Sequence, residues 1–403
     1  MDPRDTAEEA RFRAEVRAWV QGAVPRFRDA YAATRDSEQR LRISADWQAE
    51  LFEAGFGAIG WPAEYGGREG TPVQRFIVAQ ELGAAGAPWH LNMSVTLGWC
   101  APAVLDYGTP AQKEKHLRRM LSGQEVWCQL FSEPNAGSDL ASITTTAVRS
   151  DDEYVVNGQK IWSSGAHWSS FGILVVRTDP SAPRYKNLSF FICDMSNAGV
   201  EIRPITQITG ERDFCEVFFS DARLAESDRV AEEGMGWTVT VHTLLNERIG
   251  LSGGGGMHRL VSQAWEGYLR SVKQTGPDGR APLDDPRVRQ RLADVYVRSV
   301  ANRWTAMRAL DAVFKGQMPG PEASVLKLTS DAWFQQVQEA AGEVLGPAAL
   351  VTDGPGARDG GAWARGLLQS RAMTIGGGTT EVQKNIVGER VLGLPRDPRP
   401  AVP

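Results

Sequence analysis

The spacing of apolar residues changes twice along this 403-residue chain, from helical to strand-like and back to helical. Apolar side chains recur every three or four positions in residues 1–124, whereas residues 125–232 contain short β-forming runs separated by Pro, Asn, Gly and Asp. Residues 233–403 return to the helical spacing. The chain is too long for one ordinary core. We therefore predict an α+β protein with an N-terminal helical domain, a central antiparallel β-domain and a C-terminal helical domain, divided at these boundaries.

Capping signals mark where helices of the two outer domains begin. Thr6 and Glu9 have the capping-box spacing and precede an apolar stripe from Phe12 to Val20. Pro110 and Pro286 stand where Pro favours the first turn of a helix, because its missing N–H has no helical partner there. After Pro286 we expect one long helix with a shared buried side formed by Val288, Leu292, Val295, Trp304, Met307, Leu310 and Phe314.

The central region is expected to form a small antiparallel sheet or barrel. Asn157-Gly158 separates two β-forming runs, Tyr154–Val156 and Lys160–Trp162. Because Asn and Gly both tolerate positive φ, this dipeptide predicts a hairpin turn. Further strands are expected at Phe171–Val176, Leu188–Cys193 and Cys215–Phe219.

Composition narrows the function classes. The formal net charge of -5 gives no reason to expect nucleic-acid binding. Five His and four Cys show no metal-ligand spacing, so we expect no metal site and no disulfide framework, only buried free thiols. No apolar run approaches the ~20 residues of a bilayer span, and the N-terminus is charged, so we expect a cytoplasmic protein without a membrane span. The cysteines are Cys100, Cys128, Cys193 and Cys215.

Two segments of the central region suit a planar ligand. Leu130–Asp139 reads as a rigid turn at the end of a strand, with the hydroxyls of Ser132 and Ser138 available to a polar-edged ring or a carbonyl. In the second segment, Trp162 and Ser164 are two residues apart on a strand, so both side chains are expected on one face, where they could stack on a ring and donate a hydrogen bond to it. A plain turn and a core Trp are the ordinary alternatives.

Two further segments lie in the C-terminal region. Gly376–Gly378 followed by Thr379 would let the backbone approach a ligand closely at the beginning of a helix. Glu247 lies one turn before the stretch Gly250–Gly256, in which each of the four glycines Gly253–Gly256 would cost a helix roughly 1 kcal/mol relative to Ala. Another helix or a flat ligand packed close by would explain these glycines, whereas a solvated helix face is the ordinary alternative for Glu247-Arg248.

Together, these segments resemble the acyl-CoA dehydrogenase family over nearly the whole chain. Ser132 to Asp139 match the family's middle-domain motif, Asn157 to Ser164 match its Asn-Gly-x-Lys-x-Trp pattern, and Gly377 to Gln383 match its C-terminal Gly-Gly-Thr-x-Glu segment, in the family's order. The resemblance implies an N-terminal helical domain, a central β-domain and a C-terminal four-helix bundle. It also implies FAD as the cofactor and dimers or tetramers as the assembly.

The resemblance also assigns roles to individual residues. The flavin ring would be contacted by Gln129, Phe131, Ser132, Trp162 and Ser164, with Ser164 donating toward N5, the atom that accepts hydride. Ser138 would meet the substrate near the thioester or pantetheine. The rest of FAD would be contacted by Gln338, Gly342, Thr379 and Glu381, although Ala341 departs from the family's Gln-x-x-Gly-Gly pattern.

The catalytic base is expected on a helix. Many relatives carry it immediately before the C-terminal Gly-Thr, where this chain has Gly377. Leu244–Arg248 instead looks like the Leu-x-x-Glu-Arg site of isovaleryl-CoA, long-chain and steroid-side-chain dehydrogenases. Glu247 would remove the α-proton of an acyl-CoA while the β-hydride passes to flavin, giving a trans-2-enoyl-CoA. Arg248 would lie toward the pocket mouth and the CoA portion.

The resemblance leaves several points open. The thioester carrier could be CoA or an acyl-carrier protein, electron-transfer flavoprotein or a similar acceptor would reoxidise the flavin, and the assembly could be homomeric or heteromeric. Gly253–Gly256 suggests room for branched or cyclic acyl groups. Arg280 stands near the position of a family Arg-x-x-Phe-Gly stretch that this chain lacks. A flavin monooxygenase on the same fold and a non-catalytic FAD-binding partner subunit are the competing functions.

Overall fold

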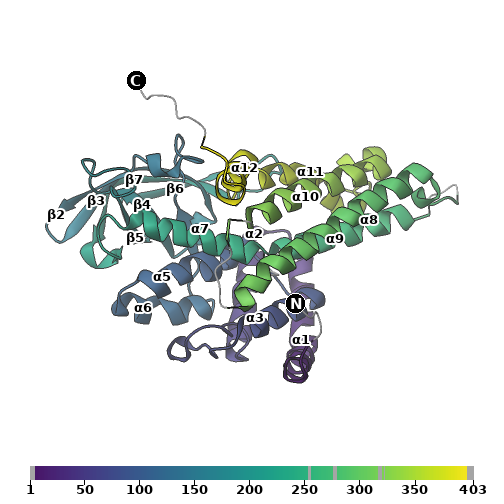
Figure 1. Ribbon diagram of the computed structural model, residues 1–403, viewed down its shortest axis with the longest axis horizontal. Helices are drawn as coiled ribbons and strands as arrows, with labels where there is room; N and C mark the ends of the chain where they lie inside the picture. Colours follow the sequence, from purple (N-terminus) through teal and green to yellow (C-terminus); the bar gives the residue numbers. More distant parts are fainter. Residues whose placement is uncertain (1–4, 253–255, 276–278, 316–319, 322, 397–403) are drawn as a thin grey trace. The chain divides into compact units, whose positions relative to one another are not determined.

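The computed structural model describes residues 5–252, 256–275, 279–315, 320–321 and 323–396, and side chains are described within these ranges except at 248–263, 310 and 313. The chain divides into two compact units (Figure 1). The larger unit comprises Met1–Gly250 and Gly254–Gly256, and the smaller one comprises Leu251–Gly253 and Met257–Pro403. Among the described residues, no helix is both long and apolar enough to cross a membrane.

The larger unit begins with helices, as the sequence predicts. Thr6 caps the first helix, since its side chain accepts from the Glu9 N–H while Glu9 reaches back to the Thr6 N–H. Phe12, Val16 and Val20 are buried in one cluster with Trp47, which confirms the expected stripe. These helices are α1 (Ala7–Ala33), α2 (Ser37–Glu53), α3 (Pro72–Ala85), α4 (Leu91–Val95), α5 (Ala101–Tyr107) and α6 (Pro110–Leu121).

An eight-stranded sheet follows in the same unit, in the order β6-β7-β3-β2-β4-β5-β8, with β1 pairing parallel to β4. Most pairings are antiparallel, as predicted, and β2 also meets β4 in a parallel sense. Two clusters of buried apolar side chains include residues of the sheet, and all four cysteines are buried and free in these clusters. The strands are β1 (Trp127–Leu130), β2 (Thr146–Ser150), β3 (Glu153–Ser164), β4 (Phe171–Arg177), β5 (Leu188–Asp194), β6 (Val200–Ile205), β7 (Phe214–Ala225) and β8 (Arg229–Val230).

The hairpin predicted at Asn157-Gly158 is wrong, because β3 continues through both residues. β3 pairs with β2 along one edge and with β7 along the other, and the register with β7 shifts between Val156 and Gly158. Asn157 exchanges two hydrogen bonds of 2.9 Å with Asp221 of β7. The positive φ of Gly158 therefore serves a bulge in a central strand, and the turn-forming tendency of Asn-Gly is overridden by pairing on both sides.

The last helix of the larger unit and those of the smaller unit match the return to helical spacing. Figure 1 shows α8, α9, α10 and α11 running alongside one another. Val295 and Val337 are buried in their common core, whereas Trp304 is 55 % exposed, so its predicted place on the buried side is wrong. The side chain of Leu310 and the residues Gly253–Gly255 lie outside what the structure describes. The helices are α7 (Gly236–Ser252), α8 (Gly256–Lys273), α9 (Pro286–Phe314), α10 (Ala323–Leu345), α11 (Ala362–Met373) and α12 (Thr380–Ile386).

Candidate active site

The turn predicted after the first strand is present in the larger unit. β1 carries the half-buried Gln129, and the chain then passes through buried Phe131 and half-buried Ser132. Glu133 and Ala136 close the turn with reciprocal backbone hydrogen bonds of 3.1 and 3.0 Å. Ser138 follows on the exposed side. The hydroxyls of Ser132 and Ser138 thus differ in burial, although both belong to one closed turn.

A buried ion pair joins this turn to β3. Lys160 Nζ lies 2.8 Å from Glu133 Oε1 and donates to the Phe131 carbonyl at 3.0 Å. Glu133 also accepts hydrogen bonds from Thr144 and Thr145. The Ile161 N–H donates to the Ser132 carbonyl at 2.9 Å, beside the pair. The two segments that carry Ser132 and Trp162 are therefore fixed to each other by charge and by backbone pairing.

Each charge of this pair acts on the pKa of the other. Burial by itself would raise the pKa of the Glu133 carboxyl, but the charge and hydrogen bond of Lys160, with the bonds from Thr145 and Thr144, hold that pKa at about 2. Burial lowers the pKa of the Lys160 ammonium to about 8, against the opposing charge of Glu133. Each charge therefore favours the ionised form of its partner, and the pair is an electrostatic link between the turn and β3.

Trp162 lies in a bulge of β3. The register with β7 shifts between Lys160 and Ser163, and Trp162 adopts φ 61°. Trp162 is 58 % exposed, and its ring meets that of Phe214 edge-on at a centroid distance of 6.3 Å. The bulge interrupts the two-residue alternation from which we expected Trp162 and Ser164 on one face. A bulky residue at positive φ with an exposed ring is a strained arrangement typical of functional sites.

The chain leaves β3 through Ser164 and Gly165. The half-buried Ser164 gives its carbonyl to Asn92 Nδ2 at 2.9 Å. Gly165 is left-handed, with φ 57°, and its N–H donates to the Asp213 carbonyl at 2.6 Å. A Cβ at Gly165 would lie 2.1 Å from Asn92 Nδ2, so only glycine fits.

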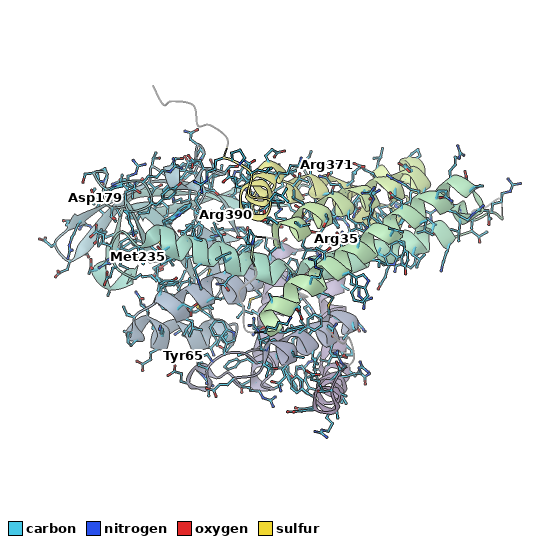
Figure 2. All side chains as sticks on the ribbon, viewed as in Figure 1. Arg35, Tyr65, Asp179, Met235, Arg371 and Arg390 are labelled. Atoms are coloured by element: carbon cyan, nitrogen blue, oxygen red, sulfur yellow. The ribbon has the colours of Figure 1, made fainter. Side chains whose placement is uncertain are left out.

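Glu247 is on a helix, as predicted, and is 7 % exposed. α7, which begins just after Met235 (Figure 2), packs Val239 and Leu244 against the core of the larger unit. His242 on the same helix lies 2.9 Å from Asp106. These contacts fix α7 to α5 within the larger unit. The side chain of Arg248 lies outside what the structure describes.

The remaining candidates belong to the smaller unit. Gln338 is buried on α10, its Oε1 accepts no hydrogen bond from the residues that the structure describes, and it packs against Gly366, where a Cβ would come within 2.6 Å of that oxygen. Gly342 lies one turn further along α10. Thr379 caps α12 by accepting from the Val382 N–H at 3.2 Å, after two glycines with positive φ, and Glu381 is exposed in the first turn. Arg280 is exposed near α9 in the sequence.

Sequence reasoning gave no role to three residues that support these segments. Glu133 and Lys160 lie inside two of the motifs, and their opposite charges were the available signal. Asn92 lies in none of the motifs. Its contact with Ser164 joins residues 72 positions apart, so no local sequence pattern could predict that contact. Among the residues that the structure describes, no group of three or more His, Cys, Asp or Glu could hold a metal ion.

Known proteins match the chain over nearly its whole length. Family models described as the N-terminal, middle and C-terminal domains of acyl-CoA dehydrogenase match residues 6–124, 128–222 and 234–392. The sequence is 38 % identical to acyl-CoA dehydrogenase IpdE1 of Mycolicibacterium smegmatis, over 96 % of this chain and 98 % of that protein.

Solved structures agree with the sequence matches. The steroid ACAD Tcur3481-Tcur3483 superposes with a TM-score of 0.83 at 32 % identity, covering 98 % of this chain and 100 % of that one. The ChsE4-ChsE5 complex from Mycobacterium tuberculosis gives a TM-score of 0.82 at 30 % identity, with the same coverage. Both comparisons extend over the helices and the sheet described above.

Proposed function

This chain belongs to the acyl-CoA dehydrogenase family, and we propose that it is the catalytic subunit, with FAD as its flavin and Glu247 as its base. The family's three-part fold and its reaction, the flavin-dependent dehydrogenation of an acyl-CoA, apply to this chain. The observation that carries the proposal is the buried carboxylate of Glu247 on α7, in the same compact unit as Ser132, Trp162 and Ser164.

The side chains of the larger unit fit a flavin ring. Trp162 offers an exposed aromatic face at a strained backbone position, and such a face gains stability by covering a flat ring. Gln129, Ser132 and Ser164 are half-buried polar side chains, suited to the polar edges of that ring. Buried Phe131 supplies an apolar neighbour. Bound flavin would supply the acceptor for the substrate's hydride.

For FAD in particular, the support comes from the smaller unit. The buried Oε1 of Gln338 finds no donor in the part of the chain that the structure describes, and an adenine amino group could donate to it. Gly342 presents no side chain beside it. Thr379 and Glu381 begin α12 after a glycine turn that allows close approach of a ligand backbone. We further propose domain boundaries of 1–124, 125–232 and 233–403, which the ranges of the three family matches support.

Glu247 would remove the substrate's α-proton. A C–H beside a thioester carbonyl is a very weak acid, so the carboxylate must be held close to it while fixed donors stabilise the enolate oxygen. Burial of Glu247 on a helix anchored by His242 and Asp106 limits its freedom. Ser138, in the exposed part of the turn, would contact the thioester or pantetheine, and Arg248 would contact the CoA portion.

We propose a branched or cyclic acyl group, of the kind produced when steroids are degraded, carried by CoA. The name of one solved relative supports this class, since that protein is called a steroid ACAD. The names of both solved relatives join two different components. We also propose an oligomer, supported by the exposed Val297, Trp304 and Leu392 of the smaller unit. We propose that electron-transfer flavoprotein accepts the electrons of the reduced flavin.

The first experiment is an anaerobic titration of the purified yellow protein with straight-chain, branched and steroid-derived acyl-CoAs, followed by flavin absorbance. Reduction by the steroid-derived class is expected, with a rate at least about 10²-fold lower in Glu247→Gln, since general-base catalysis contributes about 10²- to 10⁴-fold. Glu266→Gln, which removes an exposed carboxylate from α8, is the matched control and should react like the wild type.

The outcomes separate the competing functions. A protein that binds FAD yet is reduced by no thioester, alone or with a second chain, would be a non-catalytic partner subunit. Full activity in Glu247→Gln would remove Glu247 from the role of base. Acid extraction of the bound flavin followed by chromatography distinguishes FAD from FMN.

A further inference from the structure

Asn92 lies directly against the end of β3 that carries Ser164. Its side chain belongs to α4 and is 1 % exposed. Nδ2 donates to the Ser164 carbonyl at 2.9 Å, and the whole amide occupies the space where a side chain at Gly165 would stand, with Nδ2 at 2.1 Å and Oδ1 at 2.3 Å from an ideal Cβ. The Asn92 amide can therefore lie against the backbone at Gly165 only because Gly165 has no side chain.

Asn92 is itself held by its neighbours. Its N–H donates to His90 Nδ1 at 3.2 Å, and its carbonyl accepts from Thr96 Oγ1 at 2.8 Å. Thr96 Oγ1 in turn accepts from the Trp127 N–H at 2.8 Å. Since Trp127 begins β1, the strand of Gln129, the bonds of Asn92 connect two segments that line the proposed flavin site.

Ser163 and Ser164 pair with Cys215 and Phe214 of β7, and further hydrogen bonds support the segment at Gly165. Its N–H donates to the Asp213 carbonyl, and its carbonyl accepts from Ser169 Oγ at 2.9 Å. Asn92 acts one residue earlier, on the carbonyl of Ser164 itself. A peptide plane held at its carbonyl fixes the ψ of that residue, and with it the direction in which the Ser164 side chain leaves the backbone. The bulge at Trp162 interrupts the strand ladder just before Ser163 and Ser164, where pairing with β7 resumes.

We propose that Asn92 is a positioning residue, which orients Ser164 toward the flavin through the carbonyl of Ser164 without touching flavin or substrate. The proposal rests on the assignment of Ser164 to the flavin site. If the Asn92 amide only stabilised the fold, its loss would change the free energy of unfolding and nothing else. One that orients Ser164 must also affect how the protein holds flavin.

Asn92→Asp is the most direct variant, because it keeps the size of the side chain but replaces the NH₂ donor with an acceptor when ionised. The matched control is Gln48→Glu, since Gln48 is also buried in the larger unit and its Nε2 donates to a backbone carbonyl, that of Leu121, at 2.7 Å. The measured quantities are the dissociation constant of FAD from the apoprotein, the flavin absorbance spectrum and amide hydrogen exchange of residues 161–166.

For Asn92→Asp we expect FAD affinity to fall roughly three- to tenfold, which corresponds to one lost hydrogen bond. Faster exchange in residues 161–166 and a shifted flavin spectrum should accompany it. The deficit relative to the wild type should shrink at low pH, where a protonated Asp regains a donor. Gln48→Glu should lower the melting temperature without any of these changes. Asn92→Ser, whose hydroxyl is too short to reach the carbonyl, carries the same expectation if Asn92→Asp does not fold.

A melting temperature lowered in both variants, with wild-type FAD affinity and spectrum in Asn92→Asp and Asn92→Ser, would overturn the positioning role and leave the proposed function intact. A wild-type protein that binds no flavin would overturn the proposed function, and this inference with it.

Discussion

Lys160 and Glu133 are paired at 2.8 Å with 0 % and 5 % of their side chains exposed, and the same Lys160 ammonium donates to the carbonyl of Phe131. The pair therefore links β3 to the turn that carries Ser132. Ions cost several kcal/mol each to bury, so the pair is retained only because each charge satisfies the other and the remaining oxygens accept further hydrogen bonds.

Removing one member of this pair should destabilise the protein strongly. Glu133→Gln leaves the Lys160 ammonium buried without its counter-charge, and we expect a loss of about 3–5 kcal/mol in the free energy of unfolding, measured with urea. The double variant Glu133→Gln with Lys160→Met should lose less than the sum of the single variants. Glu201→Gln, which removes an exposed pair with Arg203, is the control and should cost at most about 1 kcal/mol. Additive losses would show that the two charges do not interact.

A methyl group at Gly165 should be poorly tolerated. Gly165→Ala forces a side chain into the Asn92 amide at a left-handed backbone position, and we expect a loss of about 1–3 kcal/mol from this overpacking. Gly22→Ala is the contrasting variant, because nothing lies within 4 Å of an added Cβ in the middle of α1. There the expected change is a gain of about 0.5–1 kcal/mol. Equal effects at both positions in urea unfolding would contradict the Asn92–Gly165 contact.

His90 should make the protein less stable in mild acid. Burial, together with the positive charge of Arg40, lowers the pKa of His90 from 6.5 to about 4. Between these two values the unfolded chain binds a proton that the folded chain does not, so stability should fall as the pH decreases from about 6.5 to about 4. His90→Asn keeps a side chain able to cap α4 but does not titrate. The free energy of unfolding, measured with urea from pH 7 to pH 4, should fall less steeply with decreasing pH in this variant than in the wild type. The same pH dependence in both proteins would exclude a contribution from His90.

Trp162 should contribute more to FAD binding than to the stability of the fold. Its positive φ costs the backbone roughly 1–2 kcal/mol, which glycine would not incur. Trp162→Gly should therefore leave the stability of the apoprotein unchanged or increase it, while weakening FAD binding. Glu69→Gly, at an exposed position with φ 51°, is the control for relief of strain alone and should leave FAD binding unchanged. Wild-type FAD affinity in Trp162→Gly would refute the stacking role.

The sequence by itself determined the features that depend on neighbours a few residues apart. The Thr6 cap, the Pro at the beginning of α6 and of α9, and the buried stripe of α1 were all predicted correctly, because helix signals act over one or two turns. The motifs that carry Ser132, Trp162 and Thr379 were also legible, since each is a short run of residues with unusual backbone or hydrogen-bonding needs.

Tertiary structure decided whatever depends on residues distant in sequence. Asn157-Gly158 continues a strand because β2 and β7 flank it, and the two-residue alternation at Trp162 is broken by a bulge against β7. Asn92 reaches Ser164 across 72 residues, and Lys160 reaches Glu133 across 27. Periodicity and propensity report which face of a segment is buried and which residues of the same segment interact. The partner of a buried polar group is set only when the chain packs, because each such group must then bond to whatever lies within its reach.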